Sequence, residues 1–140
     1  MGHSGEINRA RYCPADPKLI AVATGKGGIT LTTMTETVGK LVGHSEEGYG
    51  LCWNNINRGW LASGFSDKKV CIWDVEKNWE NSQKILPIFE ILHHRTPVED
   101  VSWHKFHPNI FASCSDDRLM NLWDMRFRSS GVSEDKKPLF

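Results

Sequence analysis

Two stretches of the chain repeat the same dipeptides at the same distance, and this repeat limits the folds that the sequence can adopt. A Gly-His pair at 43–44 is followed by Trp-Asp at 73–74, and a His-His pair at 93–94 is followed by Trp-Asp at 123–124. In both cases the tryptophan lies 29 positions after the second residue of the pair, which is His44 in one stretch and His94 in the other. A weaker copy opens with Gly-His at 2–3, so the units begin 41 and 50 residues apart. Periods of this length are typical of repeat arrays and propellers.

Short apolar runs separated by turn-forming residues fill each unit, which predicts antiparallel strands. The expected strands are 49–53, 60–63 and 70–73 in the second unit, and 101–103, 110–113 and 119–123 in the third. Fourth strands are expected over Thr37–Val42 and Ile85–Leu92, and Pro87 is compatible with an edge strand there. No window has the period of an amphipathic helix, so the predicted fold class is all-β.

Four residue types recur at matching spacings of 19, 4 and 6 in the last two units. They are His44, Ser63, Asp67 and Trp73 in one unit, and His94, Ser113, Asp117 and Trp123 in the other. This pattern resembles the WD40 repeat, and the resemblance implies a tetrad of hydrogen bonds from Trp to Ser, Ser to His and His to Asp. A buried imidazole and indole N–H both need such partners. The first unit keeps only His3, with Val22, Lys26 and Thr32 at the other positions.

The WD40 resemblance implies a partial β-propeller of about three four-stranded antiparallel blades, from a full ring of seven. The predicted units are 1–42 (degenerate), 43–92 with a polar insertion at 76–84 that contains Trp79, and 93–125, followed by a linker at 126–140 toward a next blade. A closed propeller needs about four to eight blades. We therefore expect a slice of a ring, which as an isolated chain self-associates through its open blade edges.

Composition excludes several classes of function. The 17 Lys and Arg residues balance 17 Asp and Glu residues, which argues against direct nucleic-acid binding. The longest apolar run, Leu19–Ala23, is far shorter than a membrane span, and no apolar segment of a signal peptide follows Met1. The four cysteines form no C-x-x-C pair and are expected to be reduced, buried thiols, with no cofactor implied.

Three arrangements look like catalytic or ligand sites, and each has a simpler explanation. The Ser-His-Asp sets occur twice and lack a nucleophile elbow, so a structural role is favoured over a hydrolase. His104-x-x-His107 has no convergent third ligand, so no metal site is predicted. Gly25-Lys26-Gly27-Gly28 lacks the phosphate-loop pattern and is predicted to be a β-turn.

The loops that begin at each histidine are acidic. Glu6, Glu47 and Glu99 lie three or five residues after these histidines, and consecutive blades would bring them to one channel mouth. Such a mouth suits the guanidinium or ammonium group of a basic peptide. The alternative, which the residues alone leave open, is that these carboxylates are merely solvated loop charges.

Three segments resemble one WD40 branch, the retinoblastoma-binding histone chaperones that include the small subunit of chromatin assembly factor 1. They are GEINRARY (5–12), GHSEEGYGLCWN (43–54) and PVEDVSWHKFHPNIFAS (97–113). The resemblance implies a nuclear and also cytoplasmic, non-enzymatic scaffold in chromatin assembly, deacetylase or methyltransferase complexes. It implies that basic histone tails bind at Glu6, Asn8, Glu47, Tyr49 and Glu99. The alternative is a WD40 adaptor outside chromatin, such as a ubiquitin-ligase receptor or trafficking scaffold.

Overall fold

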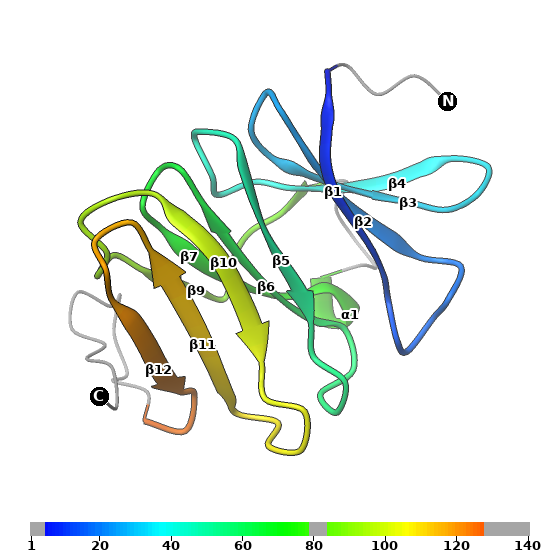
Figure 1. Cartoon of the computed structure of the whole chain (residues 1–140). Helices are drawn as coiled ribbons and strands as arrows, with labels where there is room; N and C mark the ends of the chain where they lie inside the picture. The colour runs from blue at the N-terminus through cyan, green and yellow to red at the C-terminus, as the bar shows by residue number, and fades with distance from the viewer. Residues whose placement is uncertain (1–4, 79–83, 128–140) are drawn as a thin grey trace.

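The computed structural model describes residues 5–78 and 84–127, which form three sheets (Figure 1). Each sheet begins with three or four strands that follow one another in the chain. The first sheet contains β1 (Ile7–Tyr12), β2 (Ile20–Thr24), β3 (Ile29–Thr32) and β4 (Thr37–Leu41), with the short β8 (Lys84–Ile85) at its outer edge. The second contains β5 (Gly48–Trp53), β6 (Trp60–Phe65), β7 (Val70–Asp74) and β9 (Phe89–Ile91). The third contains β10 (Val98–Trp103), β11 (Ile110–Ser115) and β12 (Met120–Asp124).

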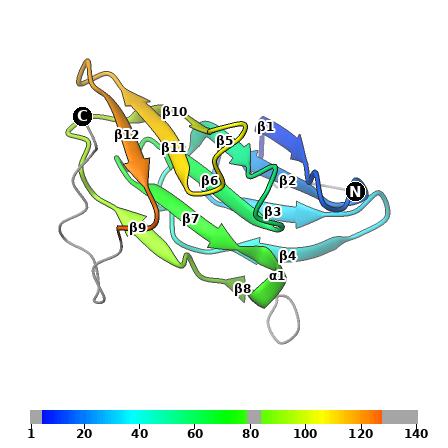
Figure 2. The same cartoon turned by 90° about the horizontal axis from the view of Figure 1, so that it is seen from below.

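These sheets are successive blades that pack face to face, which confirms the predicted all-β partial propeller (Figures 1 and 2). The first strands of the blades, β1, β5 and β10, pack beside one another along the inner side. The expected four strands are found in the second blade. The first blade has five, and the third has three among the described residues.

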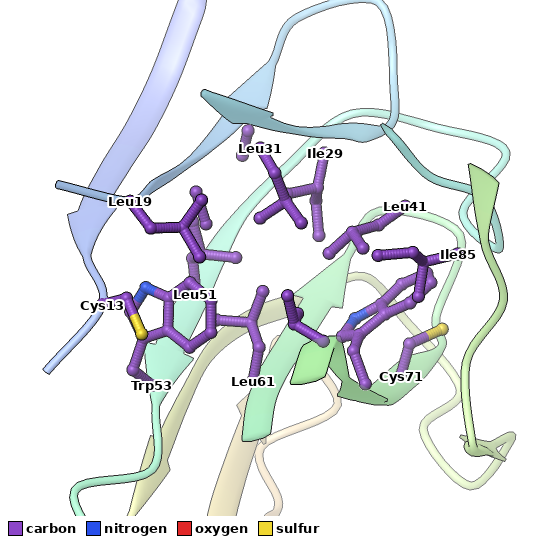
Figure 3. Close-up of a cluster of buried hydrophobic side chains, with 14 of the residues drawn as sticks. Cys13, Leu19, Ile29, Leu31, Leu41, Leu51, Trp53, Leu61, Cys71 and Ile85 are labelled. Carbon is purple, nitrogen blue, oxygen red and sulfur yellow. The ribbon is translucent and has the colours of Figure 1, made fainter. Parts of the chain in front are cut away.

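Two apolar cores lie between the blades, and they explain why the middle strands of the second blade, β6 and β7, are buried on both faces. Between the first and second blades, Ile29, Leu31 and Leu41 pack toward Leu51 and Leu61 (Figure 3). A second core fills the next interface, with Ala62, Ile72, Val101, Phe111 and Trp123 among its members. One side of β7 packs into the first core and the other side into the second core. All five of its residues are therefore buried, and the alternation of buried and exposed residues that is typical of a half-buried strand is absent.

The segment predicted as the fourth strand of the second unit, Ile85–Leu92, serves two blades instead. Ile85 pairs in parallel with Leu41 of β4, whereas β9 pairs with β7. Val42 N donates to Ile85 O at 2.8 Å, so the segment covers the outer edge of the first blade (Figure 2). Pro87 lies between the two strands and has no N–H to donate, which suits the crossover between them.

The polar insertion begins with a short helix that sequence reasoning did not predict. The helix α1 spans Val75–Asn78, directly after β7. Asp74 Oδ1 accepts a hydrogen bond from Lys77 N at 3.2 Å, as an N-cap residue does. The period of an amphipathic helix cannot reveal an element of one turn, and Trp79 lies outside the described residues.

A buried serine hydroxyl joins three segments of each regular blade. Ser63 Oγ accepts from Trp73 Nε1 at 2.9 Å and bonds His44 Nε2 at 2.7 Å. His44 Nδ1 in turn lies 2.9 Å from Asp67 Oδ2. The third blade repeats these distances through Ser113, Trp123, His94 and Asp117. Both serines are at most 1 % exposed, so the network lies inside the blade.

The first blade has other residues at the tetrad positions and forms without this hydrogen-bond network. Val22 is buried in the place of the serine, and Thr32 in the place of the tryptophan. Thr32 Oγ1 donates instead to Glu36 O at 2.9 Å, within the β3–β4 turn. His3, the remaining predicted member, lies outside the described residues. The blade therefore forms although it lacks three of the four tetrad side chains.

The two tetrad aspartates are held in their charged form. Burial acts to raise the pKa of Asp67, but the hydrogen bond and charge of His44 outweigh it, together with N–H donors from Ser45 and Lys69. The pKa of Asp67 therefore lies below its ordinary value of 3.8. Asp117 is affected in the same way, with its pKa lowered by His94 and by backbone donors.

Replacing Ser63 with alanine should strongly destabilise the chain, because it leaves the Trp73 indole and the His44 imidazole without their buried partner. We expect a loss of about 2–4 kcal/mol in the free energy of unfolding, since each orphaned buried group costs about 1–3 kcal/mol. Urea denaturation followed by tryptophan fluorescence measures this loss. Ser102→Ala, at an exposed position of β10, is the matched control, and equal effects of the two substitutions would contradict the assignment.

Acid should weaken the tetrads. A carboxyl whose pKa is lower in the folded chain contributes stability that is complete above its unfolded pKa of about 3.9 and is lost as pH falls through the folded value. The free energy of unfolding should therefore drop steeply below about pH 4. The double variant Asp67→Asn/Asp117→Asn should be less stable at neutral pH and show a shallower drop. An unchanged slope in denaturation series between pH 5 and 2 would refute this explanation.

Candidate functional site

The residues predicted to bind a peptide lie at one end of the inner strands. Glu6 and Asn8 lie at the start of β1, Glu47 and Tyr49 at the start of β5, and Glu99 at the start of β10. These strands lie side by side in three consecutive blades (Figure 1). We call the surface made by these five residues the acidic mouth.

Three of the five residues occupy equivalent β-bulges. The pairing of β1 with β2 shifts register between Ile7 and Arg9, which leaves Asn8 unpaired. The same shift leaves Tyr49 unpaired in β5 and Glu99 in β10. A bulge bends its strand and re-aims the extra side chain. The family resemblance implied Asn8 and Tyr49, and the loop spacing indicated Glu99. All three lie five residues after their unit's histidine, a signal that could have shown their equivalence but not that each is a bulge.

Side-chain and backbone hydrogen bonds bring the first two loops together. Asn8 Nδ2 donates to Glu47 Oε2 at 3.1 Å and to Gly48 O at 3.3 Å. Gly25 N donates to Glu6 O at 2.7 Å, which holds the Glu6 backbone against the β2–β3 turn. Glu6, Asn8 and Glu47 therefore form one cluster across two blades. Glu99 joins them through the packing of β10 on β5 rather than through a direct bond.

Glycines allow the loops to approach this closely. A Cβ at Gly48 would lie 2.5 Å from Phe65 Cα, and a Cβ at Gly64 would lie 2.4 Å from Val98 Cγ1. The ring of Phe65 also stacks on the His44 imidazole, with centroids 4.0 Å apart. The tetrad and the acidic mouth are therefore connected through Phe65, which sits beneath the bulge at Tyr49.

The carboxylates of the acidic mouth have no ion-pair partner among the residues that the structure describes. Glu6, Glu47 and Glu99 are exposed, and across residues 5–78 and 84–127 none of them has a Lys or Arg within ion-pair distance. Burial, together with the carboxylates of Asp100 and Glu99, raises the pKa of the Cys114 thiol. Negative potential at this end of the inner strands can attract a guanidinium or ammonium group.

The arrangements that resemble catalytic sites have structural roles in this geometry. The Ser63 hydroxyl is 0 % exposed, so a substrate carbonyl cannot reach it. His104 Nδ1 accepts from Phe106 N at 3.0 Å and His107 N at 3.1 Å, which uses the imidazole to stabilise a turn. Gly25–Gly28 is the β2–β3 hairpin turn, closed by a bond from Gly27 N to Thr24 O.

The part of the chain that the structure describes contains neither a cluster of metal-ligating side chains nor a membrane-spanning helix. No group of three or more His, Cys, Asp or Glu side chains there could hold a metal ion. No helix among the same residues has the length and apolar character that crossing a bilayer requires. All four cysteines carry free thiols. Cys13 and Cys71 are buried as predicted, whereas Cys52 and Cys114 are only partly covered.

The chain is similar to known proteins that contain WD repeats. The family model described as "WD domain, G-beta repeat" matches residues 35–74 and 86–124. The chain is 37% identical over 134 residues to "WD-40 repeat-containing protein MSI3" of Arabidopsis thaliana, covering 87% of this chain and 31% of that protein. It is 35% identical over 137 residues to "Probable histone-binding protein rba-1" of Caenorhabditis elegans, covering 90% and 33%. The chain thus spans about a third of the length of these relatives.

Gly48→Ala should displace the start of β5 at the acidic mouth, because the added methyl group clashes with the backbone of Phe65. We expect a loss of about 1–3 kcal/mol in the free energy of unfolding, as for other overpacked sites. Tyr49→Ala, at the neighbouring exposed bulge, should stay within about 0.5 kcal/mol of the unsubstituted chain. Chemical denaturation of both variants measures the difference, and a neutral Gly48→Ala would show that the close approach is not required.

Proposed function

We propose that this chain, which belongs to the WD40-repeat family, is part of a histone-binding scaffold that takes basic tail peptides at the acidic mouth. The observation that carries the proposal is the set of three carboxylates, each without a Lys or Arg partner among the described residues, at equivalent ends of neighbouring blades. The printed name of the Caenorhabditis elegans relative, which includes "histone-binding", supports the same ligand class.

The acidic mouth offers a basic side chain both charge and orientation. The amide of Asn8 holds Glu47 in place by a 3.1 Å hydrogen bond, so that the other carboxylate oxygen is left to accept from a guanidinium or ammonium group. Tyr49 is 48 % exposed, and its ring face can pack against a cation. Glu99 would then contact a second basic residue of an extended peptide, one blade further along.

A scaffold role follows from the same features, without a catalytic step. The hydroxyls of the two Ser-His-Asp sets are enclosed in the blades, whereas the exposed features are carboxylates suited to binding. We place the protein in the nucleus, as a subunit shared among chromatin assembly, deacetylase or methyltransferase complexes. The predicted unit boundaries and the predicted self-association through open blade edges remain predictions.

Charge reversal tests this proposal. Glu47→Lys and Glu99→Lys should each weaken binding of a synthetic core-histone tail peptide about tenfold at low salt. Fluorescence anisotropy of the labelled peptide measures the affinity over a series of salt concentrations. The loss should shrink as salt rises, because exposed charges are screened beyond a Debye length of about 10 Å at 0.1 M.

Glu36→Lys provides the matched control, since this exposed glutamate lies in the β3–β4 turn, at the other end of the first blade. It changes the net charge by the same amount and should leave the affinity close to that of the unsubstituted chain. Equal losses in all three variants would mean that overall charge, not the acidic mouth, attracts the peptide. No affinity for the tail peptide at low salt would contradict the proposal outright.

A further inference from the structure

A cavity of about 260 Å³ opens between the first two blades, at the opposite end of the inner strands from the acidic mouth. Three segments line it: the turn after β1 (13–19), the residues before β6 (58–59) and the start of α1 (75–76). β1 begins at the acidic mouth and ends beside this cavity, so the two sites are separated by the length of the strand. We call it the interblade cavity.

The floor of the interblade cavity is apolar. Cys13, Leu19 and Val75 line it and are between 2 and 8 % exposed. All three belong to the core that joins the first two blades, where Cys13 and Leu19 lie close to the Trp53 ring (Figure 3). An apolar group that entered would therefore rest on core side chains and displace water from them, which favours its binding.

Backbone hydrogen bonds hold both walls in place. On the first blade, Cys13 N donates to Leu19 O at 2.8 Å, which closes the turn. On the second, Val75 N donates to Gly59 O at 2.9 Å. Gly59 has a φ of +72°, and a Cβ there would lie 2.8 Å from Glu76 Cγ, so glycine lets the second wall close. These bonds fix the backbone of both walls, which limits the conformational entropy lost when a ligand binds.

The rim carries an excess of negative charge. Arg58 and Glu76, which both lie on the second-blade wall, form an ion pair with Nε and Oε1 3.1 Å apart. Asp16 is exposed, and its Oδ1 accepts from Lys18 N at 3.0 Å. Among the described residues, no Lys or Arg lies within ion-pair distance of Asp16. One carboxylate is thus available to a cation from outside.

We propose that the interblade cavity binds one aliphatic side chain of a partner peptide, while a Lys or Arg adjacent to it in that peptide pairs with Asp16. The volume is below the range of about 300–1,000 Å³ that is usual for small-molecule sites, which suits a single side chain. The apolar floor selects an aliphatic group, and the uncompensated carboxylate selects a cationic neighbour. This site does not depend on tail binding at the acidic mouth.

Selection from a displayed library of random peptides tests the proposal with the whole chain as bait. Leu, Ile or Met next to Lys or Arg should be enriched, and a synthetic peptide of the enriched sequence is then labelled for anisotropy. Ala15→Phe, which fills the cavity from its partly buried wall, should weaken this peptide at least about tenfold, since burying such a side chain is worth about 1.5–3 kcal/mol. Asp16→Lys, on the exposed rim, should weaken it as well.

Two controls separate this site from the acidic mouth. Glu36→Lys should leave affinity for the selected peptide unchanged, and an excess of unlabelled histone tail peptide should not displace it. If circular dichroism shows that Ala15→Phe does not fold, the affinities of Asp16→Lys and of the Glu36→Lys control for the selected peptide test the proposal. Enrichment of another pattern, no enrichment, unchanged affinity in both cavity variants, or displacement by the histone tail would each overturn the proposal.

Discussion

The buried hydroxyl of Ser63, and its equivalent Ser113, is the interaction on which the two regular blades depend. It accepts from a tryptophan on the third strand and bonds a histidine in the loop that enters the blade. The histidine then places its other nitrogen against an aspartate in a hairpin turn. Because every polar group in the chain of bonds has a partner, these hydrogen bonds offset the cost of burying it.

The proposed binding surface follows from that arrangement. The tetrad anchors His44 and His94, and two of the three acidic loops, those of Glu47 and Glu99, begin at these histidines. Phe65 stacks on His44 and contacts Gly48, so the position of the bulge at Tyr49 is set by the blade interior. The carboxylates are therefore presented from rigid inner strands, which limits the entropy lost when a peptide binds.

Much of the fold could be predicted from spacing. Equal distances among His, Ser, Asp and Trp indicated the repeat, and the strands of the second and third units appear within one to three residues of their expected ends. Ile85–Leu92 was wrong as a single strand, because the partner of Ile85 is β4 of another blade, and local patterns carry no information about that partner. The helix α1 was missed because one turn leaves no periodic signal.

The candidate site was likewise predictable only in part from the sequence. The sequence by itself determined which residues stand at equivalent positions, including Asn8, Tyr49 and Glu99, because repeats align by counting. Only the tertiary structure decided that these positions are bulges, that Asn8 bonds Glu47 across two blades, and that a cavity with Cys13 and Val75 in its floor opens between the blades. Each of these depends on how neighbouring sheets pack, and packing joins residues whose separation in the chain, 39 positions for Asn8 and Glu47, exceeds any local pattern.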